Sequence, residues 1–537
     1  MVKLDGVGLG YSYHLPTAGW SLRIRNALTQ FSDLFSEFNR YIAPAYYHDR
    51  CERSVQMRLY SMHKREFVMV FIAFFICFGL GLFIGLAGPP ITSTTEIDAL
   101  NLMLNDNSTK KFDNLATGPF TMRSPAMTTY NQQLWVIAKL TTGNNDDEKY
   151  DKKFLVSVAI DGLTEEHKPV TVLHKNSVRN RTRHLVCEKN ICEEFIVLHL
   201  GFLDYTHYIL TVRFYGLELF NQKYSINNLK FYFQTYNPAF TQIEIWFRFI
   251  FLLGTFFVTC WFAHTLRKYM MHDWSIEQKW MSLLLPLLML YDNPIFPLMF
   301  LFNSWIPGML DAIMQATFLS ALLLFWLCVY HGLRQNERKL LTFYVPKFFI
   351  VGMLWLSAVT LATWQKYNEL QDPTYNHSVD TKHYYDFKVF FFVFCGIYLT
   401  YLLLLILRAY SELRSMPFFD MRLKFLTLLM LVVLSISLAV TVLRFGVGVL
   451  EDNFVAELST HYNSSAQFMS FYGMFNFYLY TMAYVYSPNN RTIYDSMITK
   501  DNPAFSMIND SDEDVVYGSD EDSRRPLNRG HNDDDSD

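Results

Sequence analysis

The chain of 537 residues is poor in charge, because Asp, Glu, Lys and Arg make up only 18% of it, whereas soluble domains usually carry about 25%. The net charge is −4, and no basic stripe with interleaved aromatic residues occurs. No nucleic-acid partner is therefore expected. Apolar residues reach 51% and aromatic residues 17%. Such a composition is typical of an integral membrane protein.

Cysteine and the common catalytic motifs are also scarce. Seven scattered cysteines are too few for a disulfide-rich secreted scaffold. The sequence has no Gly-x-Ser-x-Gly or His-Glu-x-x-His motif, so neither a hydrolase nucleophile nor a zinc helix is indicated. We therefore expect no enzyme, no catalytic residues, no cofactor and no metal site. The histidines of the long polar segment lack the spacing of metal ligands: His167, His174, His184, His199 and His207.

Long apolar runs are what the sequence does contain. The run Phe67–Gly88 has no charged side chain and exceeds the ~20 residues that cross a bilayer. A polar segment follows it, and then seven further apolar runs predict seven more helices. These runs are Trp246–Thr265, Met281–Phe302, Ile313–Tyr330, Phe348–Trp364, Val389–Leu407, Phe425–Leu443 and Phe468–Tyr486. The predicted fold is an α-helical polytopic membrane protein with 1 + 7 transmembrane helices.

The first run is predicted to be a signal anchor with a cytosolic amino terminus, because a long arm ending in His63-Lys64-Arg65-Glu66 precedes it. Eight crossings return the carboxy terminus to the cytosol. The loops then predicted to be cytosolic carry more Lys and Arg than the lumenal loops, as the positive-inside rule requires. Glycosylation sequons agree with this orientation, because four open on the lumenal side: Asn107, Asn180, Asn376 and Asn463.

The polar segment between the first and second runs alternates apolar and polar residues in short stretches. They are Gln133–Thr141, Phe154–Ile160, Val170–His174, Arg183–Val186, Glu194–Leu198, Tyr208–Phe214 and Leu229–Gln234. This spacing predicts an all-β, antiparallel sandwich on the lumenal or extracellular side. Cys187 and Cys192 are expected to form a disulfide in this oxidising compartment, and two free thiols are the alternative. The cysteines in the apolar runs are expected to be small packing residues.

The predicted domains are a cytosolic arm (1–66), a signal-anchor helix (67–88), a lumenal β-sandwich (89–245), a seven-helix bundle (246–487) and a disordered acidic cytosolic tail (488–537). The arm contains an amphipathic stripe from Trp20 to Ile42, which favours a helix packed on the bundle or lying in the membrane interface over a coiled-coil partner site.

The third run contains the main ionisable candidate inside the membrane, Asp292 beside Asn293, with Pro286, Pro294 and Pro297 around them. An intramembrane carboxylate is costly and is a functional candidate by default. We expect either a hydrated ligand cavity around Asp292 and Asn293 or a structural kink with Asp292 hydrogen-bonded to a neighbouring helix. An intramembrane aspartyl protease is disfavoured, because it needs two carboxylates that share a proton, and Asp311 is placed at a helix mouth.

The acidic tail carries two short patterns typical of sorting signals, Tyr494 with Met497 and the triplet Asn502, Pro503 and Phe505. Cytosolic sorting adaptors are therefore expected partners. Ser511 and Ser519 lie among Asp and Glu residues and are candidate phosphorylation sites.

Several segments resemble known membrane protein families. Leu323–Cys328, Asn336–Arg338 and Phe471–Pro488 resemble the Wntless family, whose members carry a Golgi-dynamics-type lumenal domain before seven helices. A further set resembles the transmembrane protein 181 family more specifically: Met57–Met62, Tyr236–Phe240, Glu244–Phe249, Ile276–Trp280 and Asp452–Leu458. The resemblance implies a trafficking-related or receptor-like membrane protein and does not import Wnt binding.

The expected function is a multi-pass receptor-like glycoprotein of the Golgi, endosomes and plasma membrane, with membrane lipid and a secreted or extracellular protein or lipid ligand as partners. One alternative is an orphan cell-surface receptor for signalling or for toxin or ligand entry, although His331-Gly332-Leu333-Arg334 replaces the Asp-Arg-Tyr motif of rhodopsin-like receptors. The other alternative is an enzyme acting on lipid within the bundle.

The predicted orientation can be tested through the sequons. Asn→Gln changes at 107, 180, 376 and 463 should each lower the glycosidase-sensitive mass in cells, because only lumenal sequons are glycosylated. The matched controls are the sequons at Asn490 and Asn509, whose removal should leave the mass unchanged. Glycan found on Asn490 would reverse the orientation.

Overall fold

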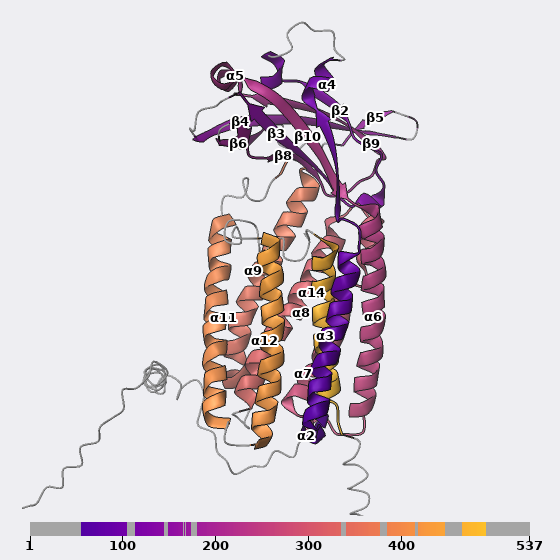
Figure 1. Cartoon of the computed structure of the whole chain (residues 1–537), viewed down its shortest axis with the longest axis vertical. Coiled ribbons are helices and arrows are strands. Elements are labelled where there is room, and N and C mark those ends of the chain that lie inside the picture. Colours follow the sequence, from indigo (N-terminus) through magenta and orange to yellow (C-terminus); the bar gives the residue numbers. More distant parts are fainter. Residues whose placement is uncertain are drawn as a thin grey trace, which may run out of the picture. The chain divides into compact units, whose positions relative to one another are not determined.

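The computed structural model describes residues 55–104, 113–143, 149–164, 166, 168–172, 180–188, 190–333, 340–375, 384–413, 417–445 and 464–489. Within them an anchor helix, a β-sheet domain and a helical bundle follow one another along the chain (Figure 1). Several predicted features lie outside the described residues. They are the arm helix, the sequons at Asn107, Asn376, Asn463, Asn490 and Asn509, and the tail residues Tyr494, Met497, Asn502, Pro503, Phe505, Ser511 and Ser519.

The sheet domain, residues 92–236, contains ten antiparallel strands in its described part. They are β1 (Thr92–Asp98), β2 (Phe120–Arg123), β3 (Leu134–Thr142), β4 (Lys149–Leu163), β5 (Pro169–Thr171), β6 (Asn180–Glu188), β7 (Ile191–Cys192), β8 (Phe195–Leu200), β9 (His207–Tyr215) and β10 (Ile226–Tyr236). Short helical segments interrupt them: α4 (Ala99–Leu104), η1 (Asp113–Ala116), η2 (Thr129–Asn131) and α5 (Glu218–Tyr224).

The strands form one sheet in the order β1-β10-β3-β7-β6-β4-β9-β2, with β8 on β3 and β5 on β4. The sheet curls so that strands from its two ends share a core. The Phe120 ring of β2 lies 5.4 Å from Phe231 of β10 and 5.7 Å from Phe214 of β9, measured between ring centroids. Burying these large rings together closes the sandwich.

The predicted all-β sandwich is confirmed, and alternation is the reason it could be predicted. In β3 the side chains of Leu134, Val136, Ala138 and Leu140 are buried while the residues between them are more exposed, as a strand with one core face requires. β1 was not predicted, because Thr-Ser-Thr-Thr-Glu-Ile-Asp is mostly polar and its central residues are exposed. It joins the sheet by pairing with β10 from Thr92 to Asp98.

The bundle is formed by long helices (Figure 1). They are α3 (Lys64–Leu86), α6 (Pro238–Leu266), α7 (Ile276–Tyr291), α8 (Trp305–Gly332), α9 (Val345–Gln371), α11 (Tyr384–Leu413), α12 (Pro417–Phe445) and α14 (Ser465–Tyr486). Three shorter elements accompany them: α2 (Arg58–Ser61), η3 (Phe296–Phe300) and η4 (Leu340–Tyr344). Over the described residues, seven helical segments are long and apolar enough to cross a membrane.

Helix α14 is the long helix outside that set of seven. Its sequence is rich in Tyr and Phe rather than in aliphatic residues, and Tyr472, Asn476, Tyr478 and Tyr486 are almost fully enclosed. It packs against α3, α6, α7 and α12. Because other helices surround it, α14 does not need the apolar surface that a lipid-facing helix needs.

Small residues let α3 and α14 approach closely, and Figure 1 shows the two helices side by side. A Cβ atom added at Gly85 would lie 2.6 Å from the Ala466 Cα, and one added at Gly88 would lie 3.0 Å from the Ser465 Cβ. Close backbone contact of this kind is how helices gain van der Waals packing in a bilayer.

The end of the bundle where α3 begins is closed by the preceding segment, residues 55–62, which we call the N-terminal strap. Met57 and Leu59 are fully buried. The strap's backbone is bonded both to the loop before α7, through Val55 N and Asp273 O at 2.9 Å, and to the end of α14, through Arg58 N and Ser487 O at 2.9 Å.

The contact between α3 and α14 predicts different effects for two glycines of the same helix. Gly85→Leu should destabilise the protein by about 1–3 kcal/mol, because its side chain would overlap α14. Gly79→Leu is the matched control, since nothing lies within 4 Å of a Cβ placed there, and it should be nearly neutral. Thermal unfolding of the purified protein in detergent measures both, and equal melting temperatures would contradict the packing.

Candidate functional site

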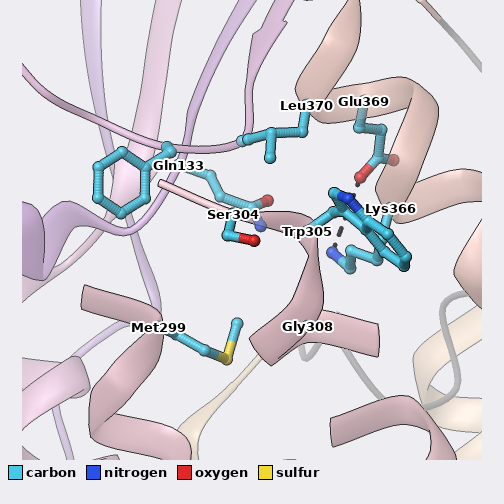
Figure 2. A pocket seen from close by; sticks show the side chains of 10 residues that line it. Gln133, Met299, Ser304, Trp305, Gly308, Lys366, Glu369 and Leu370 are labelled. Carbon is cyan, nitrogen blue, oxygen red and sulfur yellow. Dashed lines mark ion pairs between the residues drawn. The ribbon is translucent and has the colours of Figure 1, made fainter. Parts of the chain in front are cut away.

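A pocket lies where the sheet domain meets the bundle, and we call it the junction pocket (Figure 2). The sheet domain contributes Gln133, Gly201 and Phe202, and the bundle contributes residues from η3, α8 and α9. Figure 2 shows Lys366 and Glu369 facing each other as an ion pair, with 3.7 Å between Lys366 Nζ and Glu369 Oε2. The bundle residues of the lining are Met299, Ser304, Trp305, Gly308, Lys366, Glu369 and Leu370.

The sheet domain holds the segment just after α9 through polar contacts. Arg181 of β6 pairs with Asp372 at 2.5 Å, from Nη2 to Oδ2. Arg183 Nη2 donates to the Thr374 carbonyl at 2.5 Å, and the His199 backbone N–H donates to the Pro373 carbonyl at 2.7 Å. Burial alone would raise the pKa of the Asp372 carboxyl, but hydrogen bonds from Thr374 and Arg181 lower it below its usual range. The carboxylate therefore stays ionised for its pair with Arg181.

A second connection runs from the sheet domain into the membrane part. Gln132 follows η2 with φ of 55°, a left-handed conformation that is uncommon outside glycine. The side-chain amide of Gln132 donates hydrogen bonds to Thr241 Oγ1 at 3.0 Å and to Glu244 Oε2 at 3.3 Å, both on α6. Gln132 also lines a small cavity that adjoins the junction pocket and shares Gln133, Gly201, Phe202 and Met299 with it.

Arg248 continues this connection one helical turn deeper. Its Nη2 donates to Glu244 Oε1 at 2.9 Å, and its Nη1 lies 3.8 Å from Asp311 Oδ1 of α8. The guanidinium also lies over aromatic rings, 4.1 Å from the Phe296 centroid and 4.7 Å from that of Tyr472. Counter-ions and ring faces together replace the water that a buried guanidinium loses.

Asp311 and Asp292 are tied to amide side chains in the same region. Asn293 Nδ2 donates to Asp311 Oδ1 at 2.6 Å, and Gln315 Nε2 donates to the same oxygen at 2.9 Å. Asn476 of α14 donates to Asp292 Oδ1 at 2.9 Å, and Thr255 of α6 donates to Asp292 Oδ2 at 3.1 Å. We call the set formed by Gln132, Glu244, Arg248, Thr255, Asp292, Asn293, Asp311, Gln315 and Asn476 the polar seam.

The proline-rich sequence around Asp292 ends α7 instead of only bending it. The α-helix stops at Tyr291, Asp292 forms the cap, and Asn293 adopts φ of 54°. The chain resumes helical turns only in η3 at Phe296. Pro294 favours this break, because a proline disfavours the α conformation in the residue before it. The break turns the side chains of Asp292 and Asn293 toward α6, α8 and α14.

The structure places the predicted residues Asp292 and Asn293 in two adjoining hydrogen-bonded groups of the polar seam, with Asp292 bonded to Thr255 and Asn476 and Asn293 bonded to Asp311. Asp292 is fully enclosed, and its carboxylate accepts hydrogen bonds from Thr255 of α6 and Asn476 of α14. This is the hydrogen-bonded arrangement given above as one of the two expectations for Asp292. The sequence analysis missed Glu244, Arg248 and Thr255, which lie on α6. The available signal was the Glu244–Arg248 pair, because an acid and a base four residues apart share one helix face.

Two other predicted features fall within the sheet domain. Cys187 and Cys192 form a disulfide across the β6–β7 turn. Asn180 is the first residue of β6 and is exposed, so its side chain is accessible to modification. Among the described residues, no group of three or more His, Cys, Asp or Glu side chains is arranged to hold a metal ion.

The polar seam predicts that replacing Asp292 by an apolar residue lowers the stability of the protein more than replacing it by Asn. Asp292→Leu should cost about 1–3 kcal/mol, because Thr255 and Asn476 lose their buried partner. Asp292→Asn keeps the shape and one acceptor oxygen and should cost less. Both variants are measured by thermal unfolding in detergent and by delivery to the cell surface. Unchanged stability and delivery of Asp292→Leu would show that the protein does not depend on this carboxylate.

Comparison with known proteins places this architecture in a family. The family model of the Wntless-like transmembrane domain matches residues 237–490, and that of the TMEM181 GOLD domain matches residues 118–236. Human transmembrane protein 181 is 55% identical over 475 residues, which are 88% of this chain and 96% of the human protein. The two family matches meet between Tyr236 and Asn237, where β10 ends and α6 is about to begin. The chain therefore belongs to the transmembrane protein 181 family.

Proposed function

We propose that this protein is a receptor-like carrier of the secretory and endocytic system, which binds a lumenal or extracellular ligand in the junction pocket. The observation that supports the proposal is the position of the pocket between the sheet domain and the bundle. A pocket lined by both the sheet domain and the bundle lies beside a polar seam that continues to Asp292. Ligand sites are commonly concave, largely apolar, and placed between domains with a few fixed polar groups.

The junction pocket is small, with a volume of about 50 Å³, so a ligand with an apolar body would have to widen it, and its lining offers both apolar surface and a few polar groups. Trp305, Phe202, Met299 and Leu370 supply apolar surface, whereas Gln133, Ser304, Lys366 and Glu369 supply donors and acceptors. Gly201 and Gly308 leave room beside α9, since a Cβ atom at either position would meet only the side chain of Leu370 or Lys366, at 3.6 Å or more.

The polar seam supplies a route by which a ligand would influence the bundle. Gln132 lines the adjoining cavity and donates to Glu244. A ligand that displaced the Gln132 amide would change the partners of Glu244, and through it those of Arg248 and Asp311. A buried polar group without a hydrogen-bond partner is costly, so the groups around it rearrange when one partner moves.

The proposal includes sorting by cytosolic adaptors through Tyr494, Met497, Asn502, Pro503 and Phe505, with both termini in the cytosol. The proposed compartments are the Golgi, endosomes and plasma membrane. The name of human transmembrane protein 181 says only that it spans a membrane, so the ligand, the adaptors and the compartments belong to this proposal.

The competing functions fit the described geometry less well. A signalling receptor would have to open its cytosolic end, where the N-terminal strap is bonded to Asp273 and Ser487 and where Arg422 pairs with Glu277 at 2.5 Å. An enzyme acting on lipid within the bundle would need a reactive group, and carboxylate chemistry of the aspartyl type would need two carboxylates that share a proton. Asp292 and Asp311 are instead each hydrogen-bonded to neighbouring amide side chains.

The ligand-binding proposal can be tested by site-specific photo-crosslinking in cells. A photoreactive amino acid in place of Met299 should yield adducts, and adding Gly201→Phe, which fills the pocket, should reduce them about tenfold. The control position is Tyr215, exposed on β9, where Gly201→Phe should change nothing. Undiminished adducts at Met299 in a folded, surface-delivered Gly201→Phe protein would overturn ligand binding in the pocket.

A further inference from the structure

His199 is the one histidine of the described residues that joins the sheet domain to the wall of the junction pocket. It lies on β8 and is 8% exposed. Its ring stacks on Trp135 of β3, with centroids 5.1 Å apart. Its Nε2 lies 3.0 Å from Gln133 Oε1, and its Nδ1 lies 3.8 Å from Glu369 Oε1 of α9. Both Gln133 and Glu369 line the pocket.

These distances assign different roles to the two ring nitrogens. The Gln133 Oε1 atom only accepts hydrogen bonds, so the neutral ring places its hydrogen on Nε2. Nδ1 then presents a lone pair toward the Glu369 carboxylate, at a distance beyond a hydrogen bond. A proton added to Nδ1 would turn this contact into a charge-assisted hydrogen bond.

The charges around His199 come from several elements. Helix α9 presents Glu369 and Lys366, and the segment after it presents Asp372, which is paired with Arg181 of β6. Two further titratable groups lie nearby: Arg183 of β6, bonded to the Thr374 carbonyl, and Tyr236, packed against Trp135. Glu369 is therefore the acid that directly faces the ring. Burial lowers the pKa of His199 below its usual value of 6.5, and Glu369 opposes this shift only in part.

Glu369 is shared between His199 and Lys366. Its Oε1 accepts from Gln365 Nε2 at 2.6 Å and lies toward His199, whereas its Oε2 lies 3.7 Å from Lys366 Nζ. The Lys366 side chain is only 16% exposed. If Glu369 turned toward a charged His199 ring, Lys366 would lose its counter-ion inside the pocket.

We propose that the junction pocket is a proton-responsive anion site: a proton on His199 draws Glu369 away from Lys366, and the Lys366 ammonium then binds an anionic group of the ligand. This inference rests on the proposed ligand-binding role of the pocket and adds the charge of the ligand and its regulation. With His199 neutral, the Lys366–Glu369 pair carries no net charge. With His199 protonated, the three groups carry one positive charge, which favours an anion on acidification.

The anionic group is most simply a carboxylate attached to an apolar body. The Lys366 ammonium provides three donors, and Trp305, Phe202 and Leu370 lie around the same pocket. A free acid and the carboxy terminus of a peptide share this chemistry. Ligand uptake would then be stronger in acidic endosomes than at the cell surface.

The exposure of Lys366 measures this switch without a natural ligand. The full-length protein in lipid nanodiscs is treated with a water-soluble acetylating reagent at about pH 7.5 and about pH 5.5, and acetylation of Lys366 is divided by that of Lys168, which is 75% exposed. Acetylation occurs on the neutral amine, and dividing by Lys168 removes the general effect of pH on amine reactivity. We expect the ratio to rise about threefold at the lower pH, because Lys366 without its Glu369 counter-ion is more accessible and gives up its proton to the reagent more readily than in the ion pair.

Three variants separate the causes. His199→Gln cannot take the proton and should keep a constant, low ratio. Glu369→Gln removes the counter-ion and should give a high ratio at both pH values, so it tests the switch even if His199→Gln does not fold. The matched control is His184→Gln, an exposed histidine paired with Asp151, which should behave as wild type. A flat wild-type ratio, or the same rise in His199→Gln, would overturn the switch.

The anion is tested with 3-phenylpropanoate and its amide at about pH 5.5. The carboxylate should protect Lys366 from acetylation and the amide should not. An acyl peptide ending in Phe, beside its carboxamide form, distinguishes a peptide terminus from a free acid. Equal protection by acids and amides would overturn the anion site. Pocket-dependent crosslinks at Met299 with a flat acetylation ratio would leave ligand binding standing and remove only the proton response.

Discussion

The buried guanidinium of Arg248 is the interaction on which the membrane part of this structure depends. It pairs with Glu244 on its own helix, approaches Asp311 on α8, and lies over rings from η3 and α14. Removing one partner of a buried ion pair strands the other charge at a cost of about 3–5 kcal/mol, so these elements are held in one arrangement. Glu244 and Asp311 both lie beside this cation. The amides of Asn293 and Gln315 donate to Asp311, and that of Asn476 donates to Asp292, which stabilises the acids of the polar seam.

The same group of residues links the sheet domain to the bundle. Gln132 donates to Glu244, and β6 and β8 hold the chain just after α9. The two regions matched by different family models therefore share hydrogen bonds as well as a boundary. The junction pocket is lined by residues of both parts. That is the physical basis for proposing a ligand there rather than on the outer face of the sheet.

Periodicity and run length were sufficient to predict much of the fold. The strands of the sandwich followed from alternation, as in β3, and the apolar runs located the helices because a bilayer demands length and apolarity. Asp292 stood out as an acid within an apolar run. The polar seam could not be predicted as a whole, because its members are spread along the chain from Gln132 to Asn476. The local sequence of each helix does not show which other helix it packs against. Glu244 and Arg248 lay at the edge of a run, where charge is ordinary.

The sequence by itself determined the element types, the family and the presence of a carboxylate in the third span, because each depends on local composition or on matched residues. Only the tertiary structure decided that α7 ends at Tyr291, that Asp292 faces Thr255 and Asn476, and that His199 meets Glu369. These contacts depend on the curl of the sheet and the order of helices around α14. The packing of buried rings and small residues sets both of them. These contacts join residues that are far apart in the sequence, so no short segment predicts them.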